Sequence, residues 1–498
     1  MNQLLCIHIG QAGVQLASSC WELFCLEHDI QPDGTLKPEK TTTDDLDVLF
    51  NETTGGKYTA RSLLIDLDPS TVNKVASGAY KQVFQPSNRV TWKEDAANNA
   101  IRGHYTVGKE ILDESLEKIG RIVDECLFFK GFLVFNSIGG GTGGGFASLL
   151  LERLGIDFPS KEIINFNVYP SQRYSTSPVE PYNAILNISE TLNVSKTTNF
   201  VFDNERLYQI CSKGLGIEKP TYTDINRLIA QVASSVTSPL RFEGPLNYKL
   251  NELTRSLKPH PMLNCVVSSY CPLSIPPKTD PESDIDPSPS VAEITKAAFN
   301  PNNYMADCDP SKGKYLGVAA TYRGDPALKD VQESLKLTIA ENKLKFYAKS
   351  DGVKIGVTSQ PAWSIKGDNK QKLSRSLCVT SNTSAVKTVF KKIAKNYGTL
   401  YARRAFVHWY VGEGLSEGFF SEAEWNLTQI IKDYEEIEND NDNDNEGEEE
   451  IEKDERGNER EEEIEKGVKG KEGEEDDEGL GIQSDKEQLG LNQVDDNI

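Results

Sequence analysis

The segment FNSIGGGTGGGFASLL places six glycines and one threonine between an apolar stretch and an amphipathic helix pattern. Glycine can adopt positive φ angles and lets the backbone approach a ligand closely. A helix that starts directly after such a loop adds unpaired N–H groups and the positive end of its dipole, both of which suit phosphate. Thr142 contributes a hydroxyl group inside the loop. These residue types predict a polyphosphate site built mainly from backbone amides.

The glycine run has three other interpretations. A Walker loop requires G-x-x-x-x-G-K-[ST], and no lysine follows the glycines here. Gly139, Gly141 and Gly144 match G-x-G-x-x-G, but a dinucleotide site also requires an acidic residue at the end of the next strand. The strand expected over 163–169 ends in Tyr-Pro-Ser instead. A glycine turn without a ligand is disfavoured because so many glycines cost backbone entropy.

A pair of acidic residues follows another apolar segment, in SLLIDLDP. Asp66 and Asp68 are two positions apart, so their side chains project from one face of an extended strand end. Carboxylate oxygens are hard ligands that suit Mg²⁺ shared with phosphates. The alternative is that Asp68 is only a turn carboxylate ahead of Pro69. The pattern thus indicates a metal-assisted phosphate site.

The first 205 or so residues supply the scaffold for these loops. Apolar segments such as LLCIHI, SLLIDLD and GFLVFNSI are typical of buried strands, and 109–129 repeats apolar residues at helical spacing. This alternation predicts an α/β fold with a mostly parallel sheet and helices on both faces. Ligands in such folds bind beyond the carboxyl ends of the strands. The loops at Gly10, at Asp66 and Asp68, and at Gly139 all follow expected strands.

Beyond this region, a helix is expected from about Thr223, with apolar residues recurring along one side. A second region over roughly 243–380 contains strand patterns such as MLNCVVSSY and KYLGVAATYR. Further helices follow, one of which is expected to open with the capping pattern Ser421-Glu-Ala-Glu424.

The net charge of −22 is concentrated at the carboxyl end. Residues 437–498 contain 26 acidic and 7 basic residues, so the rest of the chain is nearly neutral. Such a segment, with few apolar residues, cannot bury enough surface to fold and is expected to be a disordered tail. Nine cysteines without C-x-x-C pairs argue against a disulfide framework and fit a reducing compartment. No apolar stretch reaches membrane-spanning length.

Several ordered motifs resemble the tubulin family. GGGTGGG is one residue from the family signature GGGTGSG, and the resemblance covers about 430 residues. The other matching segments are GQAGVQ at 10–15, KEDAANN at 93–99, RGHYT at 102–106, VEPYN at 179–183, PTYTDINRLI at 220–229 and RRAFVHWYVGEG at 403–414.

The resemblance implies a parallel-sheet GTP-binding domain over 1–205, and a nucleotide-base loop with a central helix over 206–242. An α+β intermediate domain over 243–380, C-terminal helices over 381–436 and a disordered acidic tail over 437–498 would follow. It also implies GTP and Mg²⁺ as cofactors, with Asp68 nearest the metal. The nucleotide contacts that it implies are Gln11, Ala12, Asp66, Asp95, Ala96, Asn98, Ser137, Gly140, Gly141, Thr142, Gly143, Thr176, Glu180, Asn204, Tyr222 and Asn226.

Base recognition among these contacts has a physical logic. Tyr222 and Asn226 are four positions apart at an expected helix start, so they share one face. A ring can stack on a purine there, while a carboxamide donates to and accepts from a guanine edge. Asn204 resembles the second guanine-reading amide, and Thr176 and Glu180 resemble ribose-side contacts. Without the resemblance, these would be surface residues of helices and loops.

The α type of tubulin fits best, through WELFCLEHDIQPDG and the long loop SQPAWSIKGDNKQKLSRSL. That loop resembles the α insertion that fills the site where β-tubulin binds taxane-type ligands. In the α type, an acid matching Glu252 positions the water that attacks the GTP of a neighbouring β subunit. The chain's own GTP is then buried in the α–β dimer, neither exchanged nor hydrolysed. The resemblance implies β-tubulin and further tubulin subunits as partners, in cytoplasmic microtubules, and motors or associated proteins at the tail. Membranes and nucleic acids are not implied.

Four features depart from the family pattern. Gly144 replaces the signature serine, which predicts a less rigid phosphate loop, and Asp68 is shorter than the usual glutamate. The segment 275–290 is proline-rich and long, and the tail ends without the family's terminal tyrosine. Lys40 matches an acetylatable lysine within an altered loop. These departures leave open a specialised GTP-binding relative that does not enter the microtubule lattice, or only modifies it.

Overall fold

The computed structural model describes residues 2–37, 46–171, 173–192, 194, 196–273, 289–347, 352–366 and 369–439. Lys40, the proline-rich segment 275–288 and the tail from 440 onward lie outside these residues. The strands are β1 (Gln3–Ile9), β2 (Phe50–Glu52), β3 (Tyr58–Ala60), β4 (Ser62–Asp66), β5 (Arg89–Thr91), β6 (Phe129–Ser137), β7 (Glu162–Tyr169), β8 (Thr197–Asp203), β9 (Cys265–Cys271), β10 (Lys314–Arg323), β11 (Lys345–Phe346), β12 (Val353–Thr358), β13 (Ala362–Lys366), β14 (Asn369–Leu373) and β15 (Ser376–Thr383).

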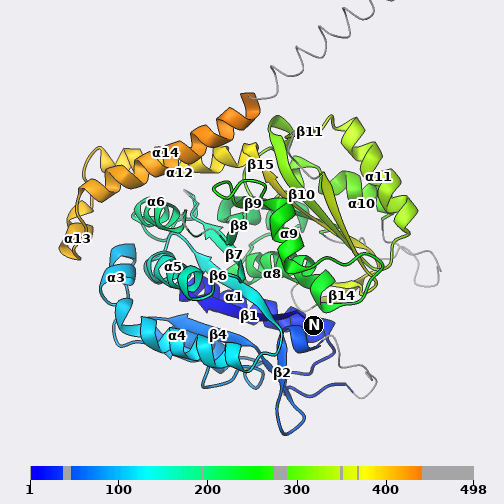
Figure 1. The fold of residues 1–498 in the computed structure, drawn as a ribbon, viewed down its shortest axis with the longest axis horizontal. Coiled ribbons are helices and arrows are strands. Elements are labelled where there is room, and N and C mark those ends of the chain that lie inside the picture. Colours follow the sequence, from blue (N-terminus) through cyan, green and yellow to red (C-terminus); the bar gives the residue numbers. More distant parts are fainter. Residues whose placement is uncertain are drawn as a thin grey trace, which may run out of the picture. The chain divides into compact units, whose positions relative to one another are not determined.

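Helices precede or follow most of these strands, as drawn in Figure 1. They are α1 (Gly10–Glu27), α2 (Pro69–Ala76), α3 (Ala100–Tyr105), α4 (Lys109–Asp124), α5 (Ala147–Asp157), α6 (Glu180–Thr191), α7 (Asn204–Gln209), α8 (Tyr222–Arg241), α9 (Leu250–Leu257), α10 (Val291–Ala298), α11 (Leu328–Glu341), α12 (Lys387–Tyr401), α13 (Val407–Gly412) and α14 (Gly418–Asn439). None of the described helices is both long and apolar enough to span a bilayer.

One sheet of eleven strands runs through the described chain, in the order β11-β10-β15-β9-β8-β7-β6-β1-β4-β5, with β12 also paired to β10. The seven neighbouring strands β9, β8, β7, β6, β1, β4 and β5 are parallel, whereas β15 is antiparallel to both β9 and β10. The expected α/β fold is therefore confirmed. The first region and the region after residue 243 share this sheet, because β8 pairs with β9 at Asn199–Cys265.

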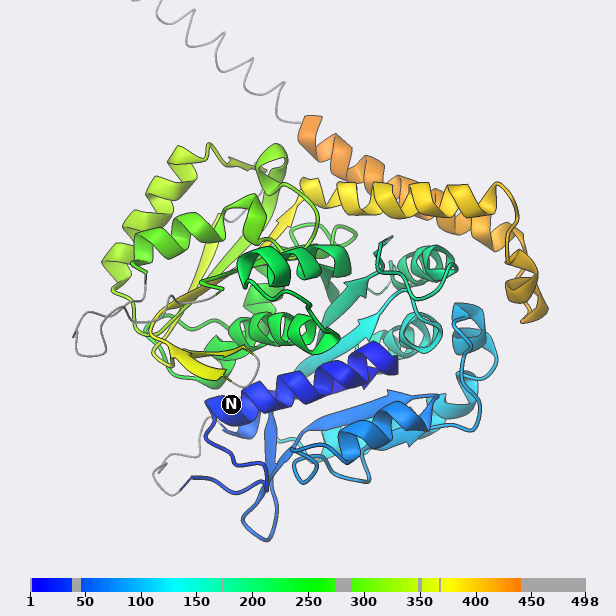
Figure 2. The same ribbon diagram turned by 180° about the vertical axis from the view of Figure 1, so that it is seen from behind.

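Alternation along the strands divides the apolar side chains between two faces. In β1, Leu4 and Cys6 join the core beneath α1 and α8, whereas Leu5, Ile7 and Ile9 join the core beneath α4 and α5. α6, α12 and α14 cover the second face further along, and α10 and α11 cover the antiparallel strands. The helix α1, blue in Figure 2, lies in front of the sheet in that view.

The carboxyl-terminal part differs from the sequence prediction at one helix start. α14 begins at Gly418, so Ser421 lies inside the helix and does not cap it. Phe420 is fully buried and packs on the rings of Tyr182 and Tyr410, which indicates that packing sets this helix start. The helix also continues to Asn439, three residues into the segment expected to be tail. Trp409 on α13 and Trp425 on α14 are exposed, at 64% and 61%.

The carboxyl-terminal ends of α1 and α8 meet in a buried ion cluster. The Glu27 carboxylate, at the end of α1, lies 2.8 Å from Arg241 Nη1 at the end of α8 and 2.7 Å from Arg323 Nη1 of β10. The Ser234 hydroxyl donates to both carboxylate oxygens. Burial alone would raise the pKa of Glu27, but the two guanidinium groups and Ser234 hold it below its ordinary value.

A second buried polar contact joins α1 to β1. Trp21 Nε1 donates to His8 Nε2 at 3.3 Å, and the His8 ring stacks on Phe135 of β6. Burial lowers the pKa of His8 to about 3, so its imidazole is neutral and can accept this hydrogen bond. All nine cysteines are free, as their spacing predicts.

Candidate nucleotide-binding site

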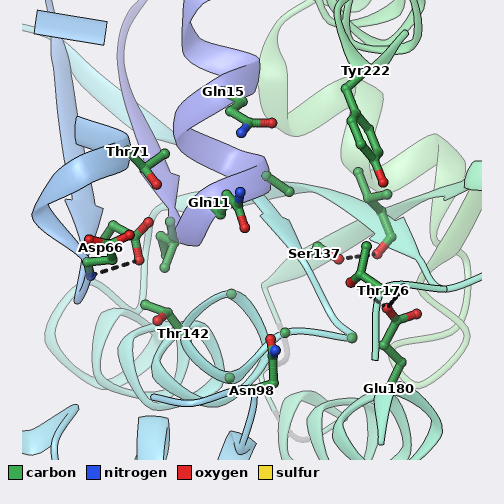
Figure 3. Close-up of a pocket in the computed structure, with 18 of the residues that line it drawn as sticks. Gln11, Gln15, Asp66, Thr71, Asn98, Ser137, Thr142, Thr176, Glu180 and Tyr222 are labelled. Atoms are coloured by element: carbon green, nitrogen blue, oxygen red, sulfur yellow. Dashed lines mark hydrogen bonds between the residues drawn. The ribbon is translucent and has the colours of Figure 1, made fainter. Parts of the chain in front are cut away.

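A pocket of about 380 Å³ lies where β1, β4, β6, β7 and β8 end, at the carboxyl edge of the parallel strands (Figure 3). This is the position expected for a ligand in an open α/β sheet. Every nucleotide contact that the resemblance implies lines this pocket, and so does Asp68. In Figure 3, Asp66 and Tyr222 lie on opposite sides of the pocket, with Gln11 between them.

The glycine run forms a π-helical turn, Gly141–Phe146, that continues into α5. In the described backbone, positive φ angles occur at Gly10 and elsewhere, but not at the glycines of 139–145. Space is what these glycines provide. A Cβ atom at Gly145 would lie 1.9 Å from the carbonyl oxygen of Ala100, and one at Gly143 would lie 2.7 Å from that of Ser137. The run therefore allows close packing of backbone against backbone.

Three buried asparagines hold this turn in place. Asn136 and Asn187 donate to the carbonyl oxygens of Gly143 and Gly144 at 2.8 and 2.7 Å. Asn183 donates to the carbonyl oxygens of Gly139 and Asn98, so it joins two of the loops that line the pocket. The amide of Gly144 donates to Gly140, and a Cβ at Gly144 would lie 2.7 Å from the Ile138 oxygen. The turn is thus held at Gly144 through its backbone, and the lower rigidity expected from a glycine at this position stays a prediction.

The turn between β1 and α1 approaches the glycine run directly. Gly10 has φ +69°, and a Cβ atom there would lie 2.8 Å from the Gly143 nitrogen. Gln11 and Ala12 follow in the first turn of α1, where amides lack partners within the helix. Gln15, one turn later on the same face, also lines the pocket, although the sequence analysis did not include it.

The acidic pair occupies the side of the pocket formed by β4 and α2. Asp66 ends β4 and is 3% exposed, and burial raises the pKa of its carboxyl to about 7. Asp68 caps α2: its side chain accepts hydrogen bonds from the amide and the hydroxyl of Ser70. The turn role considered for Asp68 is thus present, while the residue still faces the pocket. Ser70, Thr71 and Lys74 of α2 line it too.

The loop 95–98 forms a second wall beside the glycine turn. The Asp95 carboxylate accepts from the Ala97 amide at 3.1 Å, and Ala97 and Asn98 both have positive φ angles. The helix cap belongs to the next residue, since Asn99 accepts from the amides of Ile101 and Arg102. Asp95, Ala96 and Asn98 are therefore free to line the pocket.

The opposite side of the pocket carries the residues expected at the ribose and the base. Glu180 Oε1 accepts hydrogen bonds from the Thr176 amide and hydroxyl at 2.8 and 3.0 Å. These bonds order the loop at Thr176, and both residues are expected to contact the ribose. Ser137 donates to the Val168 oxygen at 3.2 Å. Asn204 and Asn226 come from the first turns of α7 and α8.

Aromatic rings surround the base end. Tyr222 is 48% exposed and lies edge-on to Tyr208, whose ring stacks on Tyr174 at a centroid distance of 4.1 Å. Tyr174 also lines the pocket, and no sequence motif pointed to it. An exposed ring at the mouth of a pocket is suited to stacking on a planar base.

Glu252 lies apart from all of these residues. It sits in the first turn of α9, where its carboxylate is 3.3 Å from Lys354 Nζ. Thr254 of the same helix donates to Glu162, the first residue of β7, so α9 lies at the amino edge of the sheet. The pocket lies at the carboxyl edge, and the eight residues of β7 span roughly 25 Å. The structure thus separates Glu252 from the pocket by about one strand length.

Fold and site together define an α/β nucleotide-binding protein whose phosphate turn lacks the Walker lysine. The Tubulin/FtsZ family GTPase domain matches residues 3–212, and the Tubulin C-terminal domain matches residues 261–395. A protein named Tubulin alpha chain, from Pneumocystis carinii, is 46% identical over 444 residues, which cover 88% of this chain and 98% of that protein. The chain belongs to the tubulin family, as a member of its α type.

Membership of the tubulin family indicates that the pocket binds a guanine nucleotide. The chain is a GTP-binding subunit of the microtubule cytoskeleton, and its amino-terminal half is a GTPase domain. The dinucleotide hypothesis is thereby excluded. The described residues include no cluster of three or more histidine, cysteine or acidic side chains arranged to hold a metal ion.

Proposed function

We propose that this chain pairs with β-tubulin, assembles into microtubules, and contributes Glu252 to GTP hydrolysis on the neighbouring β subunit. The separation of Glu252 from the pocket carries this proposal. A carboxylate about one strand length away cannot reach this chain's own nucleotide. In a head-to-tail row of subunits, however, the α9 edge of one subunit faces the pocket edge of the next.

The chain's own GTP is proposed to stay bound at the interface with its β partner. Tyr222 stacks on guanine, Asn204 and Asn226 read its edge, and Thr176 and Glu180 lie at the ribose. Gln11, Ala12, Ser137, Thr142 and the amides of 140–143 contact the phosphates, with Asp95, Ala96 and Asn98 opposite them. Mg²⁺, when bound with the nucleotide, would offset phosphate charge, and Asp68 would hold it, since a carboxylate at the pocket lining suits this ion. Asp66 also lines this side of the pocket.

Glu252 would orient the attacking water on the partner's nucleotide. A carboxylate accepts hydrogen bonds from water and can direct its lone pair toward the phosphorus atom. Lys354 lies beside Glu252 and limits the directions in which the carboxylate can point. The exposure of both side chains, at 36% and 43%, leaves them accessible to a neighbouring subunit.

Glu252→Gln in the heterodimer tests this role. We expect unchanged dimerisation and at least about a 100-fold slower release of phosphate from polymer, since loss of a positioned acid–base group costs that much. Glu333→Gln, on the exposed face of α11, removes the same charge elsewhere and is the matched control. Normal hydrolysis by the Glu252→Gln polymer would remove Glu252 from the mechanism.

Sedimentation with microtubules tests assembly separately. Copurification with β-tubulin followed by copelleting supports the proposal. A chain that retains GTP but does not copellet would instead be the specialised relative that the departures at Gly144 and Asp68 left open. The acidic segment 437–498 is proposed to attract basic motors or associated proteins. Their binding should weaken as salt screens the charges.

A further inference from the structure

The pocket lining includes a lysine that neither the phosphate motifs nor the family match assigned. Lys74 lies in the last turn of α2 and lines the pocket. It follows Ser70 by four positions and Thr71 by three, so all three side chains share the face of α2 that borders the site. Lys74 thus faces the pocket because of the helical repeat.

The charges around the pocket make this position unusual. Among the described residues that line it, four are acidic, namely Asp66, Asp68, Asp95 and Glu180. Lys74 is the one cationic side chain in the same lining. A nucleoside triphosphate brings several further negative charges into this site. A cation at the rim therefore has a strong electrostatic reason to contact the ligand.

Within the described part of the chain, no acidic side chain lies within ion-pair distance of Lys74, although its charge contributes, after the hydrogen bonds from Ser70, to the lowered pKa of Asp68. Its ammonium group is exposed and carried on a flexible stem. By comparison, the lysines Lys118 and Lys37 elsewhere in the same region pair with Glu114 and Asp29 at 2.6 and 3.2 Å. The structure thus leaves the Lys74 ammonium available for a phosphate oxygen.

The arrangement of the pocket indicates which phosphate this is. Tyr222 marks the base end, and Gln11 lies between Tyr222 and Asp66 in Figure 3. Phosphates that follow the base would therefore lie beside Gln11 and the glycine turn. Thr71 and Asp66 lie at the far side from Tyr222 in the same view. The end of a polyphosphate that reaches α2 is therefore the terminal one.

We propose that the Lys74 ammonium group binds the terminal phosphate of the guanine nucleotide. It then favours GTP over GDP and makes retention of GTP less dependent on a divalent cation. This inference rests on the proposed GTP site and adds a direct, charge-assisted contact from α2. The phosphate turn lacks a lysine, but the fold supplies one from another element.

The test measures nucleotide retained by purified heterodimer. The partner's nucleotide is first replaced by a methylene-bridged GTP analogue, so that any GTP counted comes from this chain. Wild type, Lys74→Gln, Lys74→Arg and Lys81→Gln are then passed through gel filtration with Mg²⁺ or with EDTA, and GTP and GDP are quantified by chromatography. Lys81 is exposed, near α2 and outside the pocket lining, so its substitution controls for net charge.

In EDTA, Lys74→Gln should release GTP about tenfold faster than wild type, because a charge-assisted contact is lost. After the site is emptied in EDTA and refilled with GDP, release of GDP by the variant should change less than twofold relative to wild type. Lys74→Arg and Lys81→Gln should behave as wild type, and circular dichroism should show all variants folded. Equal GTP retention by wild type and folded Lys74→Gln would overturn the inference. So would equal losses of GTP and GDP, or failure of Lys74→Arg to restore retention. Wild type without any guanine nucleotide would instead overturn the proposed GTP site.

Discussion

The two ends of the helix pair α1 and α8 use similar polar groups in opposite ways. At their amino ends, Gln11, Tyr222 and Asn226 line an open pocket. At their carboxyl ends, Glu27 and Arg241 join Arg323 in a cluster that is essentially fully buried. Buried polar groups need hydrogen-bond partners within the protein, whereas groups that line an open pocket can bind water until a ligand replaces it. The difference shows which end of the pair is structural and which is suited to binding.

The polar groups at the buried carboxyl-terminal end of the helix pair, called the sealed end below, have hydrogen-bond partners within the protein. Arg241 contacts Glu27, and its Nη2 also donates to the carbonyl oxygen of Ser234 at 2.7 Å. Arg323 donates to the carbonyl oxygens of Gln360 and Pro361. These contacts connect α1, α8 and β10 with the chain that leads into β13. Carbonyl oxygens thus help to offset the second positive charge.

Breaking the sealed end should have the largest effect. Glu27→Ala leaves two buried guanidinium groups without their carboxylate, so we expect about 3–5 kcal/mol less stability. Glu22→Ala on the same helix is the control, because its contact with Arg227 is longer, at 3.9 Å, and partly exposed. That variant should lose less than about 1 kcal/mol. Chemical denaturation of the heterodimer measures both. Similar losses would mean that burial does not distinguish the two acids.

Breaking the packing behind the open end should cost somewhat less. In Gly145→Ala the new methyl group would lie 1.9 Å from the Ala100 oxygen, so the glycine turn and α3 must move apart. Overpacking of this kind costs about 3 kcal/mol and should also lower nucleotide retention. A Cβ at Gly140 has no neighbour closer than 3.9 Å, so Gly140→Ala should be nearly neutral for stability. If both variants were equally stable, the packing explanation of the glycine run would be wrong.

The pH dependence of stability at Asp203, which lies next to the pocket residue Asn204, extends the comparison. Asp203 ends β8 and caps α7, and burial raises its pKa to about 6. A raised folded pKa means that its contribution to stability falls as the pH rises from about 4 to about 6. Asp203→Asn keeps a capping side chain without the charge. It should therefore gain about 3 kcal/mol at pH 7.5 and less than half of that at pH 4.5.

Thermal unfolding at the two pH values measures this gain, and Asp309 provides a control of opposite sign. Asp309 also caps a turn; burial acts to raise its pKa, but hydrogen bonds from Ser311 and Lys312 bring it below its ordinary value. Asp309→Asn should therefore be slightly less stable at pH 7.5. A loss of stability in Asp203→Asn at that pH would show that its charge is favourable.

Much of the fold and most of the pocket could be predicted because their signals are local or ordered along the chain. Continuous apolar segments predicted the strands that end at the pocket, and the family motifs supplied the residues beyond each strand. What the glycines do was harder to predict. Whether a glycine is needed for its φ angle or for space depends on neighbours such as Ala100, which only the folded chain brings close.

Residues far apart in sequence explain the other misses. Lys74 precedes the glycine run by 65 positions, and nothing around it resembles a phosphate motif. Glu27, Arg241 and Arg323 are distributed over about 300 positions, so no local pattern reveals that they form one cluster. The start of α14 was placed by a capping pattern, but the burial of Phe420 outweighed it. Tertiary contacts decided each of these cases.

The hydrogen bond from Trp21 to the neutral His8 gives the protein a built-in optical signal. Trp21 is fully buried, so iodide and acrylamide should hardly quench its emission, while Trp409 and Trp425 should be quenched readily. A binding partner that covers α13 or α14 would shield these two indoles and leave Trp21 unchanged. With the half-buried Trp92 and Trp363 replaced by phenylalanine, fluorescence quenching can therefore follow assembly at those helices without any attached dye.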